Sequence, residues 1–300
     1  MAPDERGRDA AELAQGAFRW KHRDGRDTAE AAYFLGTNRN KRSVTIDIAR
    51  PEGQDLVRRL AAGCDVVVEN FKVGDMARYG LDAASLRALN PRLVYCSITG
   101  YGQTGPYRDR PAHDLTFQGV GGALEERLDG DVTGLPPALL LGDNASGLYA
   151  TIGILAALQA RQASGRGTHV DIAMSDSVTA LQTAFVGMLG EAGDPPPQAE
   201  PAYDLFTCAD GRPLTLSIAH EDAYWDRLCA DLGLDDLVGM KRPARVGQRA
   251  VLKARIGGAL ATQPFAHWTE VLERAGQMWG PVNRLSDLPA DPHVAARGLL

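Results

Sequence analysis

The segments CDVVVE, at residues 64–69, and LVYCSIT, at residues 93–99, decide the fold class of this chain. Both are short apolar runs rich in β-branched residues, which is typical of strands covered on both faces. A short helix is predicted between them at residues 85–89. Strands that alternate with helices indicate a parallel sheet, and we therefore predict an α/β domain.

The alternation continues on the N-terminal side of these segments. Residues 43–48, SVTIDI, alternate apolar and polar side chains and predict a half-buried strand. A helix is then predicted from Pro51 to a cap at Gly63. The first forty residues are polar and contain no clear opening strand.

Two more helices and a strand are predicted on the C-terminal side. Residues 147–163 form a long helix whose first part is apolar all round, so we expect it to be buried. A strand follows at residues 169–174, and then a helix at residues 175–189 with Ser175 as its N-cap.

A proline-rich segment, GDPPPQAEP at residues 193–201, divides the chain. We predict a large α/β domain over residues 1–192 and a linker with a smaller α+β domain over residues 193–300. The smaller domain is expected to hold a hairpin and three helices, at residues 203–208, 213–218, 221–232, 249–260 and 265–275.

Composition limits the classes of protein that fit. A length of 300 residues suits one large domain or two ordinary ones, and a net charge of -6 disfavours nucleic-acid binding. The four cysteines lack the spacing of a zinc site, so we expect no metal, and no apolar run is long enough to span a membrane. The charged N-terminus does not resemble a secretory signal, and we expect a cytoplasmic protein.

Two local features are candidates for a functional site. In the basic cluster at residues 38–42, Arg39, Lys41 and Arg42 can bind an anion such as a phosphate, or they can form a solvated loop. Asp143 opens the apolar helix, where the helix dipole is expected to lower the pKa of its carboxyl and keep it ionised as a nucleophile or base. A plain N-cap is the alternative for this residue.

A third feature is His113, which follows a Gly- and Pro-rich loop at residues 100–106. Loops at the carboxyl ends of parallel strands are where α/β folds bind ligands. His113 is therefore either a general acid–base group or an ordinary hydrogen-bonded loop residue, and spacing alone leaves both open.

Several long motifs follow one another along the chain. They are NRNKRSVTIDIARPEG (38–53), DVVVENFKVGDMARYGL (65–81), NPRLVYCSITGYGQTGPY (90–107), the Asp143 segment with GILAALQAR (153–161), GRGTHVDIAMSDS (165–177) and PVNRLSDLPADPHVAARGLL (281–300). Together and in this order they closely resemble the class III CoA-transferases, the CaiB/BaiF family. The resemblance covers essentially the whole chain.

The resemblance implies a Rossmann-like large domain, a small domain and an interlocked homodimer. It also implies an acyl-CoA thioester as substrate, a carboxylic acid as acceptor and no tightly bound cofactor. By match to the family's motifs, the candidates for contact with CoA are Arg39, Lys41, Arg42, Asn70, Phe71 and Arg78.

In the family's transferases, the residue that matches Asp143 attacks the thioester carbonyl and forms a mixed anhydride, so that one difficult exchange is split into easier steps. Backbone N–H groups near the helix start are expected to stabilise the oxyanion. We therefore predict an acyl-CoA:carboxylate CoA-transferase with Asp143 as its nucleophile.

Two alternatives stay open. The family also contains 2-methylacyl-CoA racemases, which move the α-proton of the thioester between a His and an Asp that match His113 and Asp143, with an associated Glu that matches Glu221. Against the family pattern the chain also looks truncated at both ends, because an opening βα unit is absent and the end comes early. The other alternative is therefore an inactive or unstable fragment of such an enzyme.

Overall fold

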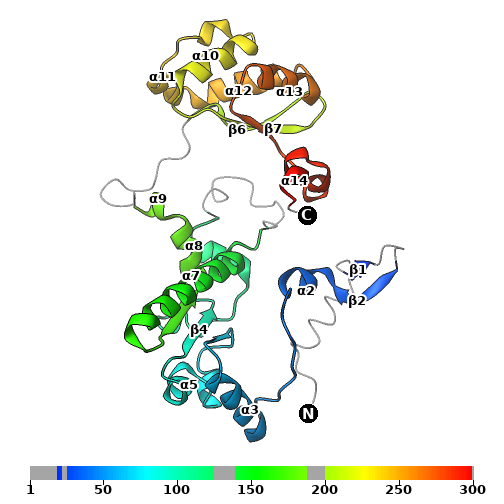
Figure 1. The fold of residues 1–300 in the computed structure, drawn as a ribbon. Helices are drawn as coiled ribbons and strands as arrows, with labels where there is room; N and C mark the ends of the chain where they lie inside the picture. Colours follow the sequence, from blue (N-terminus) through cyan, green and yellow to red (C-terminus); the bar gives the residue numbers. More distant parts are fainter. Residues whose placement is uncertain (1–18, 22–25, 125–138, 188–199, 299–300) are drawn as a thin grey trace. The chain divides into compact units, whose positions relative to one another are not determined.

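The computed structural model describes residues 19–21, 26–124, 139–187 and 200–298 (Figure 1). The chain divides into two compact units, which are Met1–Thr183 (unit 1) and Ala184–Leu300 (unit 2). The boundary predicted between residues 192 and 193 lies outside the described residues. In the described part of the chain, no helix is long and apolar enough to cross a membrane.

The first described elements of unit 1 are the antiparallel strands β1 (Arg19–Lys21) and β2 (Asp27–Ala31), followed by helix α2 (Ala32–Thr37). The strand predicted at residues 43–48 is wrong. That segment pairs with no strand of the described chain, and its Val44 is 73% exposed. Alternating side chains do not make a strand unless a neighbouring strand accepts the backbone hydrogen bonds.

A three-stranded parallel sheet forms the centre of unit 1. Its strands stand in the order β3 (Val66–Glu69), β4 (Val94–Thr99) and β5 (His169–Ala173). Tyr95 lies beside His169 in the register of the two later strands, and both pairings are parallel. All three strands lie where they were predicted, which confirms the α/β expectation.

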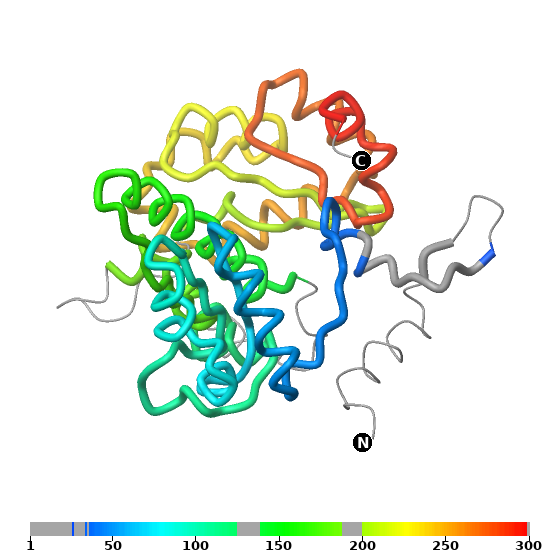
Figure 2. Tube along the Cα trace, turned by 60° about the horizontal axis from the view of Figure 1, so that its bottom comes forward, coloured from blue at the N-terminus to red at the C-terminus, as the bar shows by residue number. Residues whose placement is uncertain are grey.

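Helices α3 (Pro51–Ala62) and α5 (Ala83–Leu89) lie side by side (Figure 2), and their buried residues pack against residues of the sheet. Both correspond to predicted helices. The short helices α4 (Asp75–Arg78) and α6 (Asp114–Val120) were not predicted. The core under α3 and α5 consists of Ala61, Leu81, Leu86, Leu93 and Tyr95.

Helix α7 (Leu141–Ser164) packs against β4 and β5 and begins before its predicted start at residue 147. The expectation that its first part is buried is wrong, because Leu148, Ile152 and Leu155 are 65%, 61% and 60% exposed. These residues recur at helical spacing and form one apolar row, which we call the α7 ridge. A single helix can bury only the side that faces the sheet, and nothing else in the described part of unit 1 covers this row.

The single helix predicted at residues 175–189 is two helices, α8 (Met174–Leu181) and α9 (Thr183–Val186). Ser175 lies inside α8 and is not its N-cap. Gln182 separates the two helices, and its Nε2 donates a 2.6 Å hydrogen bond to a backbone carbonyl of a distant loop. That tertiary contact has no signal in the local sequence.

Unit 2 is built on an antiparallel sheet in the order β6 (Tyr203–Thr207), β7 (Pro213–Ser217) and β8 (Trp279–Pro281). The predicted hairpin of β6 and β7 is confirmed. β8 was not predicted because three residues are too few to establish a period.

Unit 2 also has one apolar core and several helices. They are α10 (Asp222–Asp231), α11 (Arg242–Gly247), α12 (Arg249–Leu260), α13 (Phe265–Arg274) and α14 (Pro292–Arg297), with 3₁₀ turns η2 (Asp235–Leu237) and η3 (Leu285–Ala290). The three predicted helices are α10, α12 and α13. The core includes the buried side chains of Phe206, Leu216, Trp225, Ile256 and Trp268.

Candidate active site

A cleft of about 670 Å³ lies at the edge of the unit 1 sheet where the parallel strands end. Its walls come from the residues after β3, the loop after β4 and the starts of α6, α7 and α8. Because the carboxyl ends of parallel strands meet at one edge, segments far apart in the sequence come together there. Four predicted site residues line this cleft, namely Asn70, Phe71, His113 and Asp143.

Asp143 lies in the first turn of α7 and lines the cleft. Its backbone N–H donates a 3.0 Å hydrogen bond to Oδ1 of Asp114 in α6. Gly142 permits this approach, because a Cβ there would lie 3.2 Å from the same oxygen and 3.3 Å from Cβ of Phe117. The starts of α6 and α7 are thus joined directly beside Asp143.

The pKa of Asp143 is raised above its ordinary value. The main cause is that protein atoms surround part of the carboxyl, although the residue stays open to solvent. The negative charge of Asp114 raises the pKa further, and His113 opposes the shift. The predicted lowering of this pKa is therefore wrong, because partial burial and the like charge of Asp114 raise it.

Asp114 and Gln118 form a buried polar pair beneath Asp143. They are 8% and 4% exposed. Gln118 Nε2 donates to Oδ2 of Asp114 and, at 3.0 Å, to the carbonyl of Leu139 just before α7. One side chain of α6 therefore holds both the carboxylate and the entry to α7.

Three of the N–H groups at the start of α7 are already engaged. Those of Leu141 and Asn144 donate to backbone carbonyls at 2.9 and 3.0 Å, and that of Asp143 donates to Asp114. These three groups are not free to stabilise an oxyanion, because a donor held by a carbonyl or carboxylate cannot also bind another oxygen. Stabilisation of an oxyanion by the start of this helix stays a prediction.

His113 directly precedes α6 and lines the same cleft as Asp143. The residue is exposed, and its backbone carbonyl accepts the Thr116 N–H at 2.8 Å. Its imidazole does not cap the helix. An imidazole and a carboxyl group on one cleft are the two groups that proton transfer to and from a substrate carbon requires.

Asn70 and Phe71 directly follow β3. The Phe71 N–H donates to Oε2 of Glu69 at 2.8 Å, which fixes the backbone where the strand ends. The family match predicted both residues at a CoA site, and the structure brings them onto the same cleft as Asp143.

The other predicted cations do not line the cleft. Lys41 Nζ donates to a backbone carbonyl of α2 at 2.9 Å, and Arg39 and Arg42 are exposed. Arg78 forms an ion pair with Asp75, which is itself a cleft residue. Contact of these four cations with CoA stays a prediction.

Three cations that the sequence analysis did not single out line the cleft, namely Lys72, Arg108 and Arg110. The guanidinium carbon of Arg110 lies 3.7 Å from the ring centroid of Tyr107, and Nε of Arg108 lies 3.3 Å from Oδ1 of Asp109. Their position was the available signal, because each stands in a segment that follows the end of a parallel strand.

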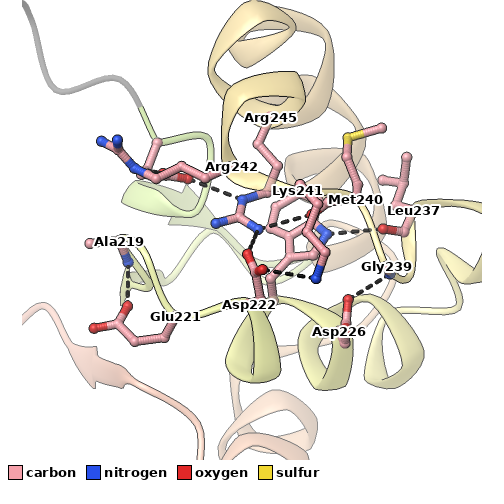
Figure 3. Close-up of polar contacts among 12 residues, drawn as sticks. Ala219, Glu221, Asp222, Asp226, Leu237, Gly239, Met240, Lys241, Arg242 and Arg245 are labelled. Carbon is pink, nitrogen blue, oxygen red and sulfur yellow. Dashed lines mark hydrogen bonds and ion pairs between the residues drawn. The ribbon is translucent and has the colours of Figure 1, made fainter.

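Glu221 belongs to unit 2, where it directly precedes α10 (Figure 3). Its Oε2 accepts the Ala219 N–H at 3.0 Å, and this hydrogen bond is the main cause that lowers the pKa of the carboxyl. The structure fixes Glu221 within its own unit. Its predicted association with His113 and Asp143 stays a prediction.

A buried ion network lies next to Glu221 at the start of α10 (Figure 3). Arg245 of α11 is fully buried, with Nη1 2.6 Å from Oδ1 of Asp222 and Nε 3.3 Å from Oε2 of Glu200. Asp222 is the first residue of α10, so the network fixes the position at which that helix begins. The sequence analysis missed Arg245 because nothing near it in the chain marks an arginine as buried.

Comparison with known proteins places these observations in a family. The family model described as CoA-transferase family III matches residues 15–300. The chain is 37% identical over 285 residues to the succinate–glutarate CoA-transferase of Agrobacterium fabrum, covering 91% of this chain and 70% of that protein. It is 32% identical over 289 residues to the acetyl-CoA:oxalate CoA-transferase of Acetobacter aceti, covering 90% of this chain and 72% of that protein.

A solved structure is also similar to this chain in both fold and sequence. The crystal structure of a CaiB/BaiF family protein from Brucella suis matches with a TM-score of 0.79 and 35% sequence identity. The match covers 97% of this chain and 78% of that one.

Proposed function

The chain belongs to CoA-transferase family III, and on that premise we propose that it transfers coenzyme A from an acyl-CoA thioester to a carboxylic acid. The observation that carries the proposal is Asp143, a carboxyl group on the cleft where the parallel strands end. CoA is then a substrate, and no tightly bound cofactor takes part. Both curated relatives are named for dicarboxylic acids, so we propose a dicarboxylic acid as one substrate.

In the proposed reaction the Asp143 carboxylate attacks the thioester carbonyl, which forms an acyl–aspartyl anhydride and releases the CoA thiolate. The thiolate attacks the aspartyl carbonyl, so that the donor acid leaves and CoA becomes bound to Asp143. The acceptor carboxylate attacks this thioester and releases the thiolate again. The thiolate then takes the acceptor's acyl group, and the Asp143 carboxylate is restored.

Each attack places negative charge on a carbonyl oxygen. Because the N–H groups of Leu141, Asp143 and Asn144 are occupied, we propose that Lys72, Arg108 and Arg110 supply the positive charge of the cleft. Phosphate and carboxylate oxygens bind such side chains through charge-assisted hydrogen bonds. Contact of the acyl-CoA with Asn70 and Phe71 is supported by their place on the cleft.

The remaining cations are proposed from the family match alone. Arg39, Lys41, Arg42 and Arg78 lie outside the cleft lining and are exposed or paired with neighbouring groups. The adenosine 3′-phosphate and pyrophosphate of CoA extend far from the thioester, so cations beyond the cleft are chemically suitable partners for them.

A trapping experiment tests the transferase proposal. The protein is incubated with succinyl-CoA or another acyl-CoA in the presence of hydroxylamine, with and without a dicarboxylic acid. An anhydride or thioester at Asp143 is converted to a hydroxamate, which mass spectrometry locates on the peptide that contains Asp143. The controls are Asp143→Asn and Asp176→Asn, the second being an exposed aspartate of α8 outside the cleft. If no hydroxamate forms across a panel of acyl-CoAs, the proposal fails.

Racemisation of a 2-methylacyl-CoA is the second candidate, because His113 and Asp143 line the same cleft. In that reaction one group removes the α-proton and the other returns a proton to the opposite face of the carbon. The substrate would exchange its α-hydrogen with D₂O in the absence of an acceptor acid, and His113→Ala would abolish the exchange. Exchange without hydroxamate formation would favour the racemase over the transferase.

We also propose a homodimer, as the family match implies. The α7 ridge exposes Leu148, Ile152 and Leu155 on the helix that carries Asp143, and a second copy that covers this ridge would remove apolar surface from water. Sedimentation of the wild type and of Ile152→Asp measures this association. A dimer that the variant weakens supports the proposal, and a wild-type monomer contradicts it.

A further inference from the structure

Asp114 is a buried carboxylate with neutral donors around it. Its Oδ1 accepts the Asp143 N–H at 3.0 Å, and its Oδ2 accepts Nε2 of Gln118. A buried carboxylate normally lies beside a cation, because otherwise the loss of water is poorly compensated. Among the described residues, the ion pairs of unit 1 join other carboxylates, namely Asp47, Asp55, Asp65, Asp75 and Asp109.

Gln118 holds this arrangement in one orientation. The carbonyl of Leu139, which can only accept, receives a 3.0 Å hydrogen bond from Nε2 of Gln118. The amide therefore cannot turn its oxygen toward Leu139 without losing that bond. As a result Gln118 always presents a donor to Asp114, and the carboxylate has a fixed position under the first turn of α7.

We propose that Asp114 and Gln118 are positioning residues for Asp143. They fix the first turn of α7 and keep a negative charge beside the reacting carboxylate. Their catalytic role rests on the proposed function, because the position of Asp143 matters to the reaction only if Asp143 is the nucleophile.

Several charged groups from the surrounding elements line the same cleft as Asp143. They are Asp114 and His113 at the start of α6, Lys72 and Asp75 after β3, and Arg108, Asp109 and Arg110 in the loop after β4. Among the elements packed on α7, α8 carries Asp176, which accepts from Ser175, and β5 carries Asp171, which accepts from Gln103. Of these groups, Asp114 raises the pKa of Asp143 by its charge and His113 lowers it.

A raised pKa serves a carboxylate nucleophile. The more basic carboxylate donates its electron pair more readily to the thioester carbonyl once it is ionised, and the penalty is loss of the ionised form at low pH. Removal of the Asp114 charge is therefore expected to lower the pKa of Asp143 and to extend the reaction to lower pH.

Two variants separate the charge from the positioning. Asp114→Asn keeps the size of the side chain and removes its charge. The new amide N–H₂ then lies opposite Nε2 of Gln118, which the hydrogen bond to the Leu139 carbonyl keeps as a donor, so two donors meet there. Gln118→Met keeps the volume, removes the donor and leaves the charge. We expect Asp114→Asn to move the acid limb of the pH–rate profile to lower pH. We expect Gln118→Met to lower kcat about tenfold through misplacement of Asp143.

The direct test is a ¹³C NMR titration of protein labelled at the aspartate carboxyl carbon. Asp143→Asn identifies the Asp143 signal, and Asp176→Asn is the matched control because it removes an exposed aspartate of α8 outside the cleft. The titration midpoint of the Asp143 signal should move to lower pH in Asp114→Asn and should stay at the wild-type pH in Asp176→Asn. An identical midpoint in the wild type and Asp114→Asn would overturn the proposal.

The outcomes distinguish this inference from the proposed function. If wild-type protein forms no hydroxamate, the transferase proposal fails, yet the titration still decides whether Asp114 acts on Asp143. If circular dichroism shows that Asp114→Asn is unfolded, the rate of hydroxamate formation in Gln118→Met tests the positioning role instead. Hydroxamate formation at the wild-type rate in that variant overturns the positioning role.

Discussion

Two buried charges of this protein, one in each unit, are held in opposite ways. In unit 2 the buried guanidinium of Arg245 lies between the carboxylates of Glu200 and Asp222. In unit 1 the buried carboxylate of Asp114 lies beside a second carboxyl group, Asp143, and accepts hydrogen bonds from neutral donors. The pKa of Asp222 is lowered, mainly by its hydrogen bond from Arg245, whereas that of Asp143 is raised.

The difference teaches where each kind of charge is useful. Opposite charges satisfy one another and fix the ends of helices, so Arg245 can be buried as part of the framework of unit 2. Like charges leave a carboxyl group that is easier to protonate and more reactive when ionised, which suits a site on an open cleft. Four predictions would break or sharpen this comparison.

The largest effect is expected for Asp143→Asn. CoA transfer should fall on the order of 10⁴-fold, because the covalent step loses its nucleophile. Unit 1 should not lose stability, since the substitution also removes a repulsion from Asp114. A product assay and thermal melting measure the two effects. Activity above a tenth of wild type would exclude Asp143 as the nucleophile.

Arg245→Met should have the largest effect on stability. It leaves Glu200 buried with only Arg242 as an ionic partner, and the free energy of unfolding of unit 2 should fall by about 3 kcal/mol. Urea unfolding can be followed by tryptophan fluorescence, because Trp225, Trp268 and Trp279 lie in unit 2.

The matched control for this variant is Arg255→Met, which breaks a more exposed pair with Asp236. It should change the urea midpoint far less than Arg245→Met. Equal effects of the two variants would mean that burial does not distinguish these arginines.

A pair of glycine substitutions on α7 should have smaller effects of opposite sign. A Cβ at Gly142 would press on Asp114 and Phe117, so Gly142→Ala should destabilise by about 1 kcal/mol and slow the reaction. A Cβ at Gly147 would meet nothing within 4 Å, so Gly147→Ala should stabilise the helix by about 0.5–1 kcal/mol. Thermal melting of both variants tests the contrast, and two stabilised variants would contradict the close approach at Gly142.

The smallest effect is the response to acid, which should differ in sign between the units. The pKa of Asp222 is lowered in the folded state. The stability that this gives is present above the pKa of the unfolded chain, about 4, and is lost as pH falls through the pKa of the folded state. The pKa of Asp143 is raised in the folded state, so protonation of its carboxyl favours the folded form. The contribution of this group to the free energy of unfolding therefore increases as pH falls toward the pKa that the group has in the unfolded chain. Hydrogen exchange of α7 and α10 amides from pH 7 to pH 3 can follow both units. If Asp143→Asn and Asp222→Asn change the pH dependence of this exchange in the same direction relative to wild type, the contrast between the units is removed.

Much of the fold was predictable because it depends on local periodicity. The three strands of the parallel sheet, the β6–β7 hairpin and helices α10, α12 and α13 follow patterns within single segments. The failures depend on distant parts of the chain. Residues 43–48 have a strand pattern but pair with no strand among the described residues, and the first part of α7 is apolar although one side of it faces solvent.

The site was predictable to the extent that topology placed it. Asn70, Phe71, His113 and Asp143 come together because carboxyl ends of parallel strands share an edge, and the motifs already marked those residues. Lys72, Arg108 and Arg110 were missed although they stand in the same segments. Their position after parallel strands was a signal, but basic residues are common in loops, and that position alone did not distinguish these three from other loop cations.

The sequence by itself determined the family, the three strands of the parallel sheet, and Asp143 as the candidate nucleophile. Only the tertiary structure decided how that carboxyl behaves. A helix start predicts a lowered pKa from the chain's own dipole, but the pKa depends on every charge within a few ångströms and on access to water. Asp114 stands 29 residues earlier in the chain and becomes a hydrogen-bonded neighbour of Asp143 only when α6 and α7 pack together.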